Sequence, residues 1–450
     1  MRNNSADALH CSQIQQNLRL YSAYSRSAIS SAHSSGCSRR NARPSFGSSS
    51  GGSIAIAANA QCHPPLTPPR RGLQGAQFPA KRLSRIWSYW LLCVAFWLLA
   101  IAPASASVLL RVAIIDGASQ VKIASSTPAV VRDGAGRTLG EIANRTSYSV
   151  QSRGAQLAMD RWQTSQFWIE PKNGGYVYIG DRWYRGRTHL VVSNNTLSAI
   201  NVVDIEQYLY SVLGAEMDSR WPQEALKAQA VAARTYALYH RERRGSNIYD
   251  LGDSQSWQVY KGVETEASST YAAVDATSGQ VLTYNGELIE AVFHSSSGGH
   301  TENVEDIWQD ARPYLRGVPD YDAGTPVFQW TKTFSAAELR GLISGVGNIA
   351  TLKPERTTQT GRIITMRAIG DAGERVISGD DLRYFLDLKS SRFSVQTNNG
   401  NFVINGFGFG HGVGMSQWGA YNLARRGANY QQILLYYYQN ANLAIIQVDR

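Results

Sequence analysis

The segment GFGFGHGVG, residues 406–414, places a glycine at every second position. Successive side chains of an extended chain point to opposite faces, so a strand here would carry no side chain on one face. Glycine lowers the stability of a strand and often marks a position where a ligand or another backbone approaches closely. A flexible glycine-rich loop is the alternative. The segment therefore predicts either a strand with one bare, closely approached face or a loop.

The net charge of +10 comes from the N-terminal quarter of the chain. Residues 1–106 contain 11 Lys or Arg and one Asp, whereas the rest of the chain contains 33 basic and 33 acidic side chains. Because this larger part is formally neutral, the charge does not indicate binding to nucleic acid. All four cysteines also precede residue 107, which excludes a disulfide scaffold, a thiolate metal site and a cysteine nucleophile from the larger part.

Residues 81–106 have the order of a secretory signal peptide. A basic cluster, KRLSR, precedes an apolar run over residues 90–101, and the small residues APASA follow. We predict cleavage after Ala106 and export to the periplasm or cell envelope. An uncleaved membrane anchor is the alternative, although the apolar run is short for a spanning helix. Residues 1–80 lack a periodic apolar pattern, which indicates a disordered extension or a start codon assigned too far upstream.

We expect residues 107–450 to form one α+β domain. Apolar and polar residues alternate between turn signals until Asp204, which predicts several antiparallel strands followed by a helix with Asp204 as its N-cap. The segment 221–245 predicts a long alanine-rich helix, and its small side chains favour a central position. The end of the chain predicts a C-terminal helix pair separated at Gly427.

A single glutamate is the first candidate for chemistry. Glu216 follows Gly214 and Ala215 in a short connection between two predicted helices. A poorly solvated carboxyl group has a raised pKa, so it can act first as an acid and then as a base near neutral pH. From these residues alone, a helix cap or a surface glutamate is the alternative.

Two histidines flank the sequence SSSGG. His294 and His300 could hold a metal together with Glu305 or Asp306, or they could form a polar network with the serines. A serine–histidine nucleophile is a third interpretation, but the strand–elbow–helix context of hydrolases does not surround these serines. In the glycine segment, His411 is expected to face a ligand because its neighbours offer no other polar side chain.

Four motifs occur in order: YLYSVLGAEM with WPQEALKAQAVAARTYAL, then DSQSWQVYKG, AVFHSSSGGHTEN and GFGFGHGVGMSQWGA. Together they resemble the SpoIID/LytB family of stage II sporulation D proteins and amidase enhancers, over about residues 107–448. Active members of this family are similar to lytic transglycosylases, which cut the glycan strands of peptidoglycan. The resemblance implies that Glu216 is the catalytic acid/base. One carboxylate suffices, because the muramyl 6-hydroxyl of the substrate replaces water as the nucleophile.

The resemblance also implies a substrate site along the glycine segment, with its bare face against a sugar ring. The candidate substrate contacts are Gln258, Tyr260, His411, Ser416, Gln417 and Trp418. Of these, Trp418 would stack on a sugar, and His411, Ser416 and Gln417 would supply hydrogen bonds. Gln258 and Tyr260 are further candidates for the groove.

The chain departs from the family pattern in two places. Some members carry Cys and His zinc ligands near the serine loop, whereas no cysteine is present here, so we expect no metal and a structural polar cluster at His294 and His300. The usual DSTxxQVY motif is altered to DSQSWQVY. We therefore predict an exported lytic transglycosylase without a cofactor. A glycan-binding module that stimulates a cell-wall amidase is the main alternative, and a metal-dependent hydrolase is the third.

Overall fold

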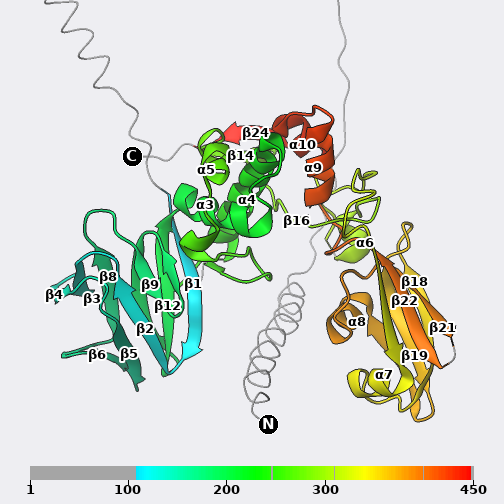
Figure 1. The fold of residues 1–450 in the computed structure, drawn as a ribbon, viewed down its shortest axis with the longest axis horizontal. Helices are drawn as coiled ribbons and strands as arrows, with labels where there is room; N and C mark the ends of the chain where they lie inside the picture. Colours follow the sequence, from blue (N-terminus) through cyan, green and yellow to red (C-terminus); the bar gives the residue numbers. More distant parts are fainter. Residues whose placement is uncertain (1–107, 245–246, 309, 399, 447–450) are drawn as a thin grey trace, which may run out of the picture. The chain divides into compact units, whose positions relative to one another are not determined.

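The computed structural model describes residues 108–244, 247–308, 310–398 and 400–446 (Figure 1). The predicted leader and signal peptide and all four cysteines, in residues 1–106, lie outside the described residues. In the described part of the chain, no helix combines the length and the apolar composition needed to cross a membrane. Helices and mostly antiparallel strands make up this part, which confirms the α+β fold class.

Two antiparallel sheets follow the start of the described chain. Their strand orders are β13-β1-β12-β11-β8-β3-β4 and β10-β9-β2-β5-β6-β7, and β13 pairs with β1 in parallel. The strands are β1 (Leu109–Ala118), β2 (Gln120–Ser125), β3 (Ala129–Asp133), β4 (Thr138–Ile142), β5 (Tyr148–Arg153), β6 (Gln156–Met159), β7 (Trp162–Thr164), β8 (Gln166–Pro171), β9 (Val177–Ile179), β10 (Arg182–Tyr184), β11 (Arg187–Ser193), β12 (Thr196–Asp204) and β13 (Leu251–Gly252).

The alternating sequence pattern places one side of each sheet in a common core. In β3, Val131 is buried and its neighbour Val130 is half-buried. Val131 of the first sheet and Ile123 and Val150 of the second belong to one buried cluster. Burying a side chain of this size contributes about 1.5–3 kcal/mol, so the cluster stabilises the pairing of the two sheets.

The helix after Asp204 and the long alanine-rich helix begin close to where the sequence predicts them. The Asp204 carboxylate accepts hydrogen bonds from the backbone N–H groups of Glu206 and Gln207, and so caps α3 (Ile205–Glu216). The alanine-rich helix α4 (Gln223–Arg244) contacts α3, α5 (Ser268–Asp275), α9 (Gln417–Arg425) and α10 (Tyr430–Tyr437).

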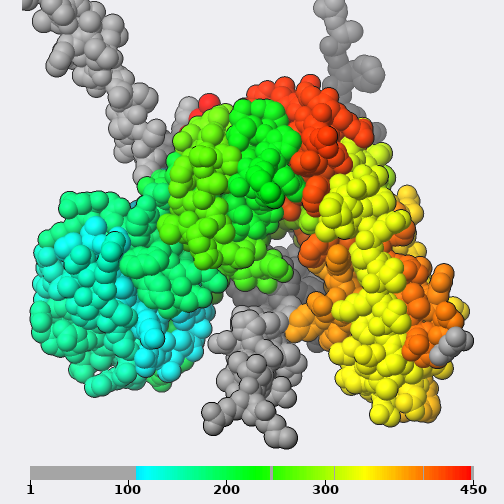
Figure 2. Space-filling model, viewed as in Figure 1, coloured from blue at the N-terminus to red at the C-terminus, as the bar shows by residue number. Residues whose placement is uncertain are grey.

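Burial of α4 on two sides confirms its predicted central position. Ala230 and Ala233 lie in the cluster shared with the two sheets, whereas Ala228 and Ala232 lie in a second cluster with α10. The C-terminal pair, α9 and α10, packs against α4, as the contact of the red and green surfaces in Figure 2 shows. Small side chains on α4 allow this close approach from both sides.

Short elements complete the region around α4. They are η1 (Gly262–Thr265), β14 (Gln280–Tyr284), β15 (Glu287–Leu288), β16 (Phe293–His294), α6 (Val304–Ile307), β23 (Met415–Ser416) and β24 (Asn442–Ile445). β14 pairs with β15 and β24, whereas β16 pairs with β23 in parallel. The β16–β23 pair joins the histidine and serine motif to the end of the glycine segment.

Residues 329–407 have a third hydrophobic cluster of their own, which includes Leu339, Met366 and Ile404. Two three-stranded sheets, β17-β22-β21 and β18-β19-β20, and two short helices form this part. The elements are β17 (Gln329–Ser335), α7 (Ala336–Leu342), β18 (Ile349–Thr357), β19 (Ile363–Gly370), β20 (Gly373–Ser378), α8 (Gly379–Phe385), β21 (Phe393–Asn398) and β22 (Asn401–Phe407).

Candidate functional site

Glu216 is the last residue of α3, and three distant segments meet at its carboxyl group. Its Oε1 accepts a hydrogen bond of 2.9 Å from the backbone N–H of Val259, and its Oε2 accepts one of 3.3 Å from Nε2 of Gln417. The side chain is half-buried, and burial raises the pKa of this carboxyl group, although the two hydrogen bonds act in the opposite direction. The site therefore favours a proton on Glu216 over a wider pH range than in water.

Close packing fixes the end of α3. A Cβ atom on Gly214 would lie under 3.0 Å from the carbonyl oxygen of Thr265 in η1, so only glycine fits between the two elements. Thr265 also donates from its hydroxyl to the carbonyl oxygen of Ser211, one turn earlier. These contacts hold the end of α3, and with it the backbone of Glu216, against η1.

Gln258 supports the loop that carries Val259. Its side chain is fully buried, accepts a hydrogen bond of 3.1 Å from the hydroxyl of Tyr208 and donates one of 3.1 Å to the carbonyl oxygen of Ala233. Both ends of its amide are bonded within the interior and the residue is 0% exposed, so Gln258 does not contact a substrate, contrary to the prediction.

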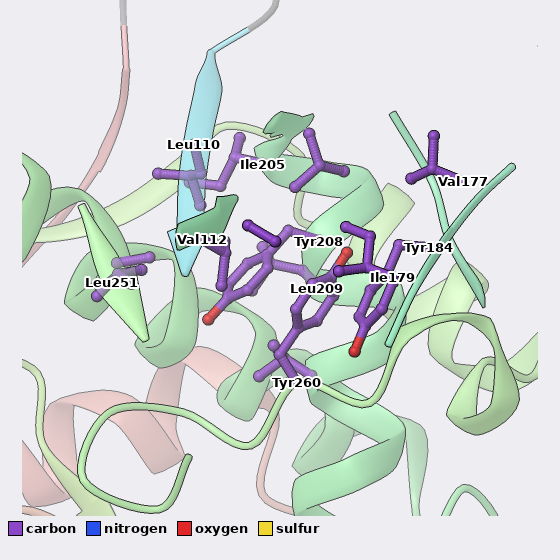
Figure 3. Packing of buried hydrophobic residues seen from close by; sticks show 14 of the residues in the cluster. Leu110, Val112, Val177, Ile179, Tyr184, Ile205, Tyr208, Leu209, Leu251 and Tyr260 are labelled. Carbon is purple, nitrogen blue, oxygen red and sulfur yellow. The ribbon is translucent and has the colours of Figure 1, made fainter. Parts of the chain in front are cut away.

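Tyr260 also lies in the interior. Its hydroxyl donates a 2.8 Å hydrogen bond to Oδ1 of Asn201, and its ring packs against the rings of Tyr184 and Tyr208 (Figure 3). Only 2% of the residue is exposed, which leaves no surface for a sugar. The altered DSQSWQVY motif thus places Gln258 and Tyr260 in the interior, on either side of Val259, whose backbone N–H donates to Glu216.

The glycine segment is not one continuous strand. β22 ends at Phe407, and the glycines at 408, 410, 412 and 414 have φ values of +75°, +118°, +83° and +71°. Glycine adopts these values without the steric cost that other residues incur. The prediction of a strand with a bare face is therefore wrong, because the chain turns at each of these positions.

Other parts of the same chain fill the space beside these glycines. A Cβ atom on Gly408 would lie 2.6 Å from the carbonyl oxygen of Ser296, and one on Gly410 would lie 2.6 Å from Cβ of His294. On Gly414 it would lie under 3.0 Å from the carbonyl oxygen of Val292. Residues 292–298 therefore pack closely against these glycines and occupy the space that was predicted for a sugar ring.

His411 is held by the backbone. Its Nε2 donates to the carbonyl oxygen of Phe293 at 3.0 Å, and its Nδ1 accepts from the N–H of Val413 at 3.1 Å. Burial, together with the nearby charge of Arg383, lowers the pKa of His411 to about 3, so the ring is neutral. Since both ring nitrogens are bonded, His411 has no polar atom left for a ligand.

The other candidate metal ligands have protein partners. His300 Nδ1 lies 2.6 Å from the carbonyl oxygen of Thr301, Glu305 pairs with Arg316, and Asp306 accepts from the side chain of Asn303. His294 is buried and bonds through Nδ1 to the carbonyl oxygen of Val413. Among the described residues, no three His, Cys, Asp or Glu side chains are grouped so as to hold a metal ion.

The start of α9 brings three predicted residues to the site. The buried hydroxyl of Ser416 caps the helix by accepting from the N–H of Gly419, and Gln417 donates to Glu216. The half-buried ring of Trp418 lies 4.5 Å from that of Trp221 and 5.3 Å from that of Tyr421.

We call Trp221, Trp418 and Tyr421 the aromatic trio. Trp221 and Tyr421 complete it with a ring separation of 5.0 Å, and all three rings are half-buried. Half-buried aromatic rings beside an acidic residue are suited to contact the apolar faces of sugars. The sequence did not indicate Trp221 as a site residue, because its position is typical of the start of a helix. It also lies 197 positions before Trp418, so no local pattern links the two.

Comparison with known proteins gives two family matches. The family described as "Stage II sporulation protein" matches residues 193–284, and "Domain of unknown function (DUF8618)" matches residues 320–414. The first match includes Glu216, and the second covers most of the part with its own hydrophobic cluster.

Several curated proteins are similar over longer stretches. The chain is 35% identical over 269 residues to stage II sporulation protein D of Bacillus subtilis, which covers 55% of this chain and 76% of that protein. It is 34% identical over 273 residues to an uncharacterized protein of Brachyspira hyodysenteriae, which covers 60% of this chain and 74% of that protein. Over 290 residues it is 30% identical to the amidase enhancer of Bacillus subtilis, covering 52% of this chain but 40% of that protein.

Proposed function

Because the chain belongs to the family of stage II sporulation protein D, we propose that it acts on the cell wall as a lytic transglycosylase. The proposed substrate is the glycan strand of peptidoglycan, cut between muramyl and glucosaminyl units. The observation that carries this proposal is the half-buried Glu216, whose carboxyl group has a raised pKa and two fixed hydrogen-bond donors.

One glutamate can perform both proton transfers of this reaction. Protonated Glu216 donates its proton to the glycosidic oxygen as the bond to the muramyl C1 breaks. The resulting carboxylate then accepts the proton of the muramyl 6-hydroxyl, whose oxygen bonds to C1 and closes the 1,6-anhydro ring. Glu216 regains its proton, so the cycle needs no water and no second carboxylate.

The surroundings of Glu216 suit both halves of this cycle. Burial favours the protonated acid before the reaction, whereas the N–H of Val259 and the amide of Gln417 stabilise the carboxylate that forms during it. The aromatic trio, beside Gln417 at the start of α9, supplies apolar rings for the sugar on one side.

We also propose that the protein is exported, on the strength of the sequence of residues 81–106. Peptidoglycan lies outside the cytoplasmic membrane, so an enzyme that cuts it has to cross that membrane. A cleaved signal would release the protein into the periplasm or envelope, whereas an uncleaved one would anchor it there.

A second candidate function is stimulation of a cell-wall amidase by a glycan-bound but inactive protein. The similarity to an amidase enhancer favours it, although the chain covers less than half of that protein. Both functions use the aromatic trio, but only the enzyme needs a proton on Glu216.

The test is a digest of purified peptidoglycan with the purified protein, followed by mass spectrometry for 1,6-anhydromuramyl ends. Glu216→Gln keeps the size of the side chain but cannot donate and recover a proton, so the rate should fall at least about a hundredfold. Binding to peptidoglycan should change little. Glu242→Gln is the matched control, because Glu242 is exposed on α4.

Two outcomes would overturn the enzyme assignment. One is equal release of anhydromuramyl ends by Glu216→Gln and the unaltered protein. The other is no release by either protein while both accelerate a purified cell-wall amidase, and this result would establish the second candidate.

A further inference from the structure

The carboxyl group of Asp320 packs against the first turn of α9. Its Oδ1 accepts a hydrogen bond of 2.6 Å from the hydroxyl of Tyr437, and its Oδ2 accepts one of 2.6 Å from the hydroxyl of Ser297. A Cβ atom on Gly419 would lie under 3.0 Å from the same Oδ1, so this oxygen lies directly against the backbone of the helix. We call residues 295–299, SSSGG, the serine loop. Asp320 therefore joins the serine loop to both α9 and α10.

A second acid holds the serine loop from inside. Asp322 is fully buried, and its Oδ2 accepts hydrogen bonds from the hydroxyl of Ser296 at 2.5 Å and from the N–H of Gly298 at 2.7 Å. Burial, together with the charge of Asp322, raises the pKa of Asp320. Since Ser296 and Ser297 are 0% exposed and donate to these two acids, they fix the loop and are not placed to act as nucleophiles.

The backbone on both sides of Gln417 is bonded to the segment that leads into the serine loop. Ser416 pairs with His294 in the β16–β23 ladder, and the N–H of Trp418 donates to the carbonyl oxygen of Ser295 at 3.0 Å. Gln417 itself is 5% exposed. Because its neighbours are fixed in this way, the direction of the Gln417 side chain depends on how the start of α9 is held.

The hydrogen bond from Gln417 to Glu216 leaves little tolerance for movement. It measures 3.3 Å between Nε2 and Oε2. N–H···O bonds are mostly shorter than this, and at about 3.6 Å no such bond remains. A small shift of the start of α9 away from α3 would therefore remove one of the two donors to Glu216.

We propose that Asp320 is a positioning residue of the cell-wall reaction, which holds the start of α9 where Gln417 reaches Glu216. This inference rests on the proposed function. The negative charge of Asp320 also attracts the positive end of the α9 dipole, which strengthens the attachment. Without it, the carboxylate that forms on Glu216 during the reaction would keep only the N–H of Val259.

The test measures the titration of Glu216 in the whole protein without substrate. The carboxyl carbon is followed by NMR in protein with isotope-labelled glutamate, and Glu216→Gln identifies its signal. The hydrogen bond from Gln417 lowers the pKa of Glu216, so Gln417→Met should raise this pKa. Asp320→Asn should raise it as well, by less.

The direction of the change separates positioning from electrostatics. Removal of a negative charge near Glu216 would by itself lower the pKa of this group, so a rise in Asp320→Asn identifies a displaced donor. In the peptidoglycan digest, the rate should fall about tenfold in Gln417→Met, the scale of a hydrogen bond to a charged group, and by less in Asp320→Asn. Cosedimentation with peptidoglycan should remain unchanged in both variants.

Asp381→Asn is the matched control, because Asp381 is exposed in α8 and loses the same charge. Ser297→Ala removes one donor from Asp320 and keeps its charge, so it decides the question if Asp320→Asn does not fold. It should raise the pKa of Glu216 in the same direction.

The proposal is overturned if the titration of Glu216 in Asp320→Asn, or in Ser297→Ala where that variant decides, is unchanged or moves to lower pH. It is also overturned if Asp381→Asn causes an equal rise, or if Gln417→Met causes none. Lower Tm without a shift in the titration would indicate a purely structural role. Absence of anhydromuramyl products would refute the lytic activity, whereas the coupling of Asp320 to Glu216 is read from the titration alone.

Discussion

The buried pair of Glu302 and Arg362 permits a quantitative test of how the glycine segment is held. The side chains are 2% and 0% exposed, and Nε of Arg362 lies 3.4 Å from Oε1 of Glu302. Burial lowers the pKa of Arg362 to about 10, with the charge of Glu302 opposing the shift. Nη1 of the same guanidinium donates to the carbonyl oxygen of Gly410 at 3.2 Å. The pair therefore attaches the glycine segment to the turn between β18 and β19.

Glu302→Gln removes the negative charge and leaves a buried guanidinium uncompensated. Breaking a buried pair in this way costs about 3–5 kcal/mol, and since Gln can still accept from the hydroxyls of Thr358 and Thr360, we expect the lower end, about 3 kcal/mol. The measurement is the free energy of unfolding in urea, with unchanged m-value as the sign of an unaltered unfolding transition.

The control is the exposed pair of Glu355 and Arg367, whose side chains are 27% and 31% exposed. Glu355→Gln should cost less than about 1 kcal/mol, because Arg367 also pairs with Glu374 and water screens the charges. The double variant Glu302→Leu/Arg362→Met should recover most of the loss. A cost for Glu302→Gln within the error of that for Glu355→Gln would refute the reasoning.

Three further predictions concern the site. Burial raises the pKa of Glu216, so its contribution to stability is present below the unfolded pKa and is lost as the pH rises through the folded pKa. At pH 8 the unaltered protein therefore carries a buried carboxylate that Glu216→Gln removes. Calorimetry should show that Glu216→Gln raises Tm at pH 8 and changes it much less at pH 4. Gly412→Ala should lower the free energy of unfolding by more than Gly427→Ala, since both have positive φ but only the Cβ at 412 would meet the guanidinium of Arg362; equal costs would contradict this packing. Trp221→Ala should weaken peptidoglycan binding by about tenfold in cosedimentation, the scale of one aromatic contact, and unchanged binding would remove the trio from the substrate site.

Local patterns predicted the elements that depend on local chemistry. Asp204 caps α3 as expected, because a short polar side chain directly before a helical apolar pattern commonly accepts hydrogen bonds from the first backbone N–H groups of the helix. The alanines of α4 indicated close packing on the helix, and both flanking clusters confirm it. Each of these features depends on residues that lie close together in the sequence.

The site was harder to predict, because glycine and polar residues have more than one use. Glycine at alternate positions fits a bare strand face, but it also fits a chain that needs positive φ repeatedly, as Gly408 and Gly412 do. Similarly, Gln258 and Tyr260 in a polar stretch suggested surface contacts, yet their hydrogen bonds are satisfied in the interior. Partners such as Ala233 and Asn201 lie too far away in sequence for any local pattern to reveal them.

The hydrogen bond between Glu216 and Gln417 spans 201 positions of the chain, and this separation bears on the order of events during synthesis. A chain grows from its N-terminus, so the glutamate emerges long before its amide partner does. Contacts between such distant residues form only after the intervening loop has been closed, at a cost in entropy. A nascent chain therefore holds the carboxylate with at most one of its two donors until α9 has been made and docked.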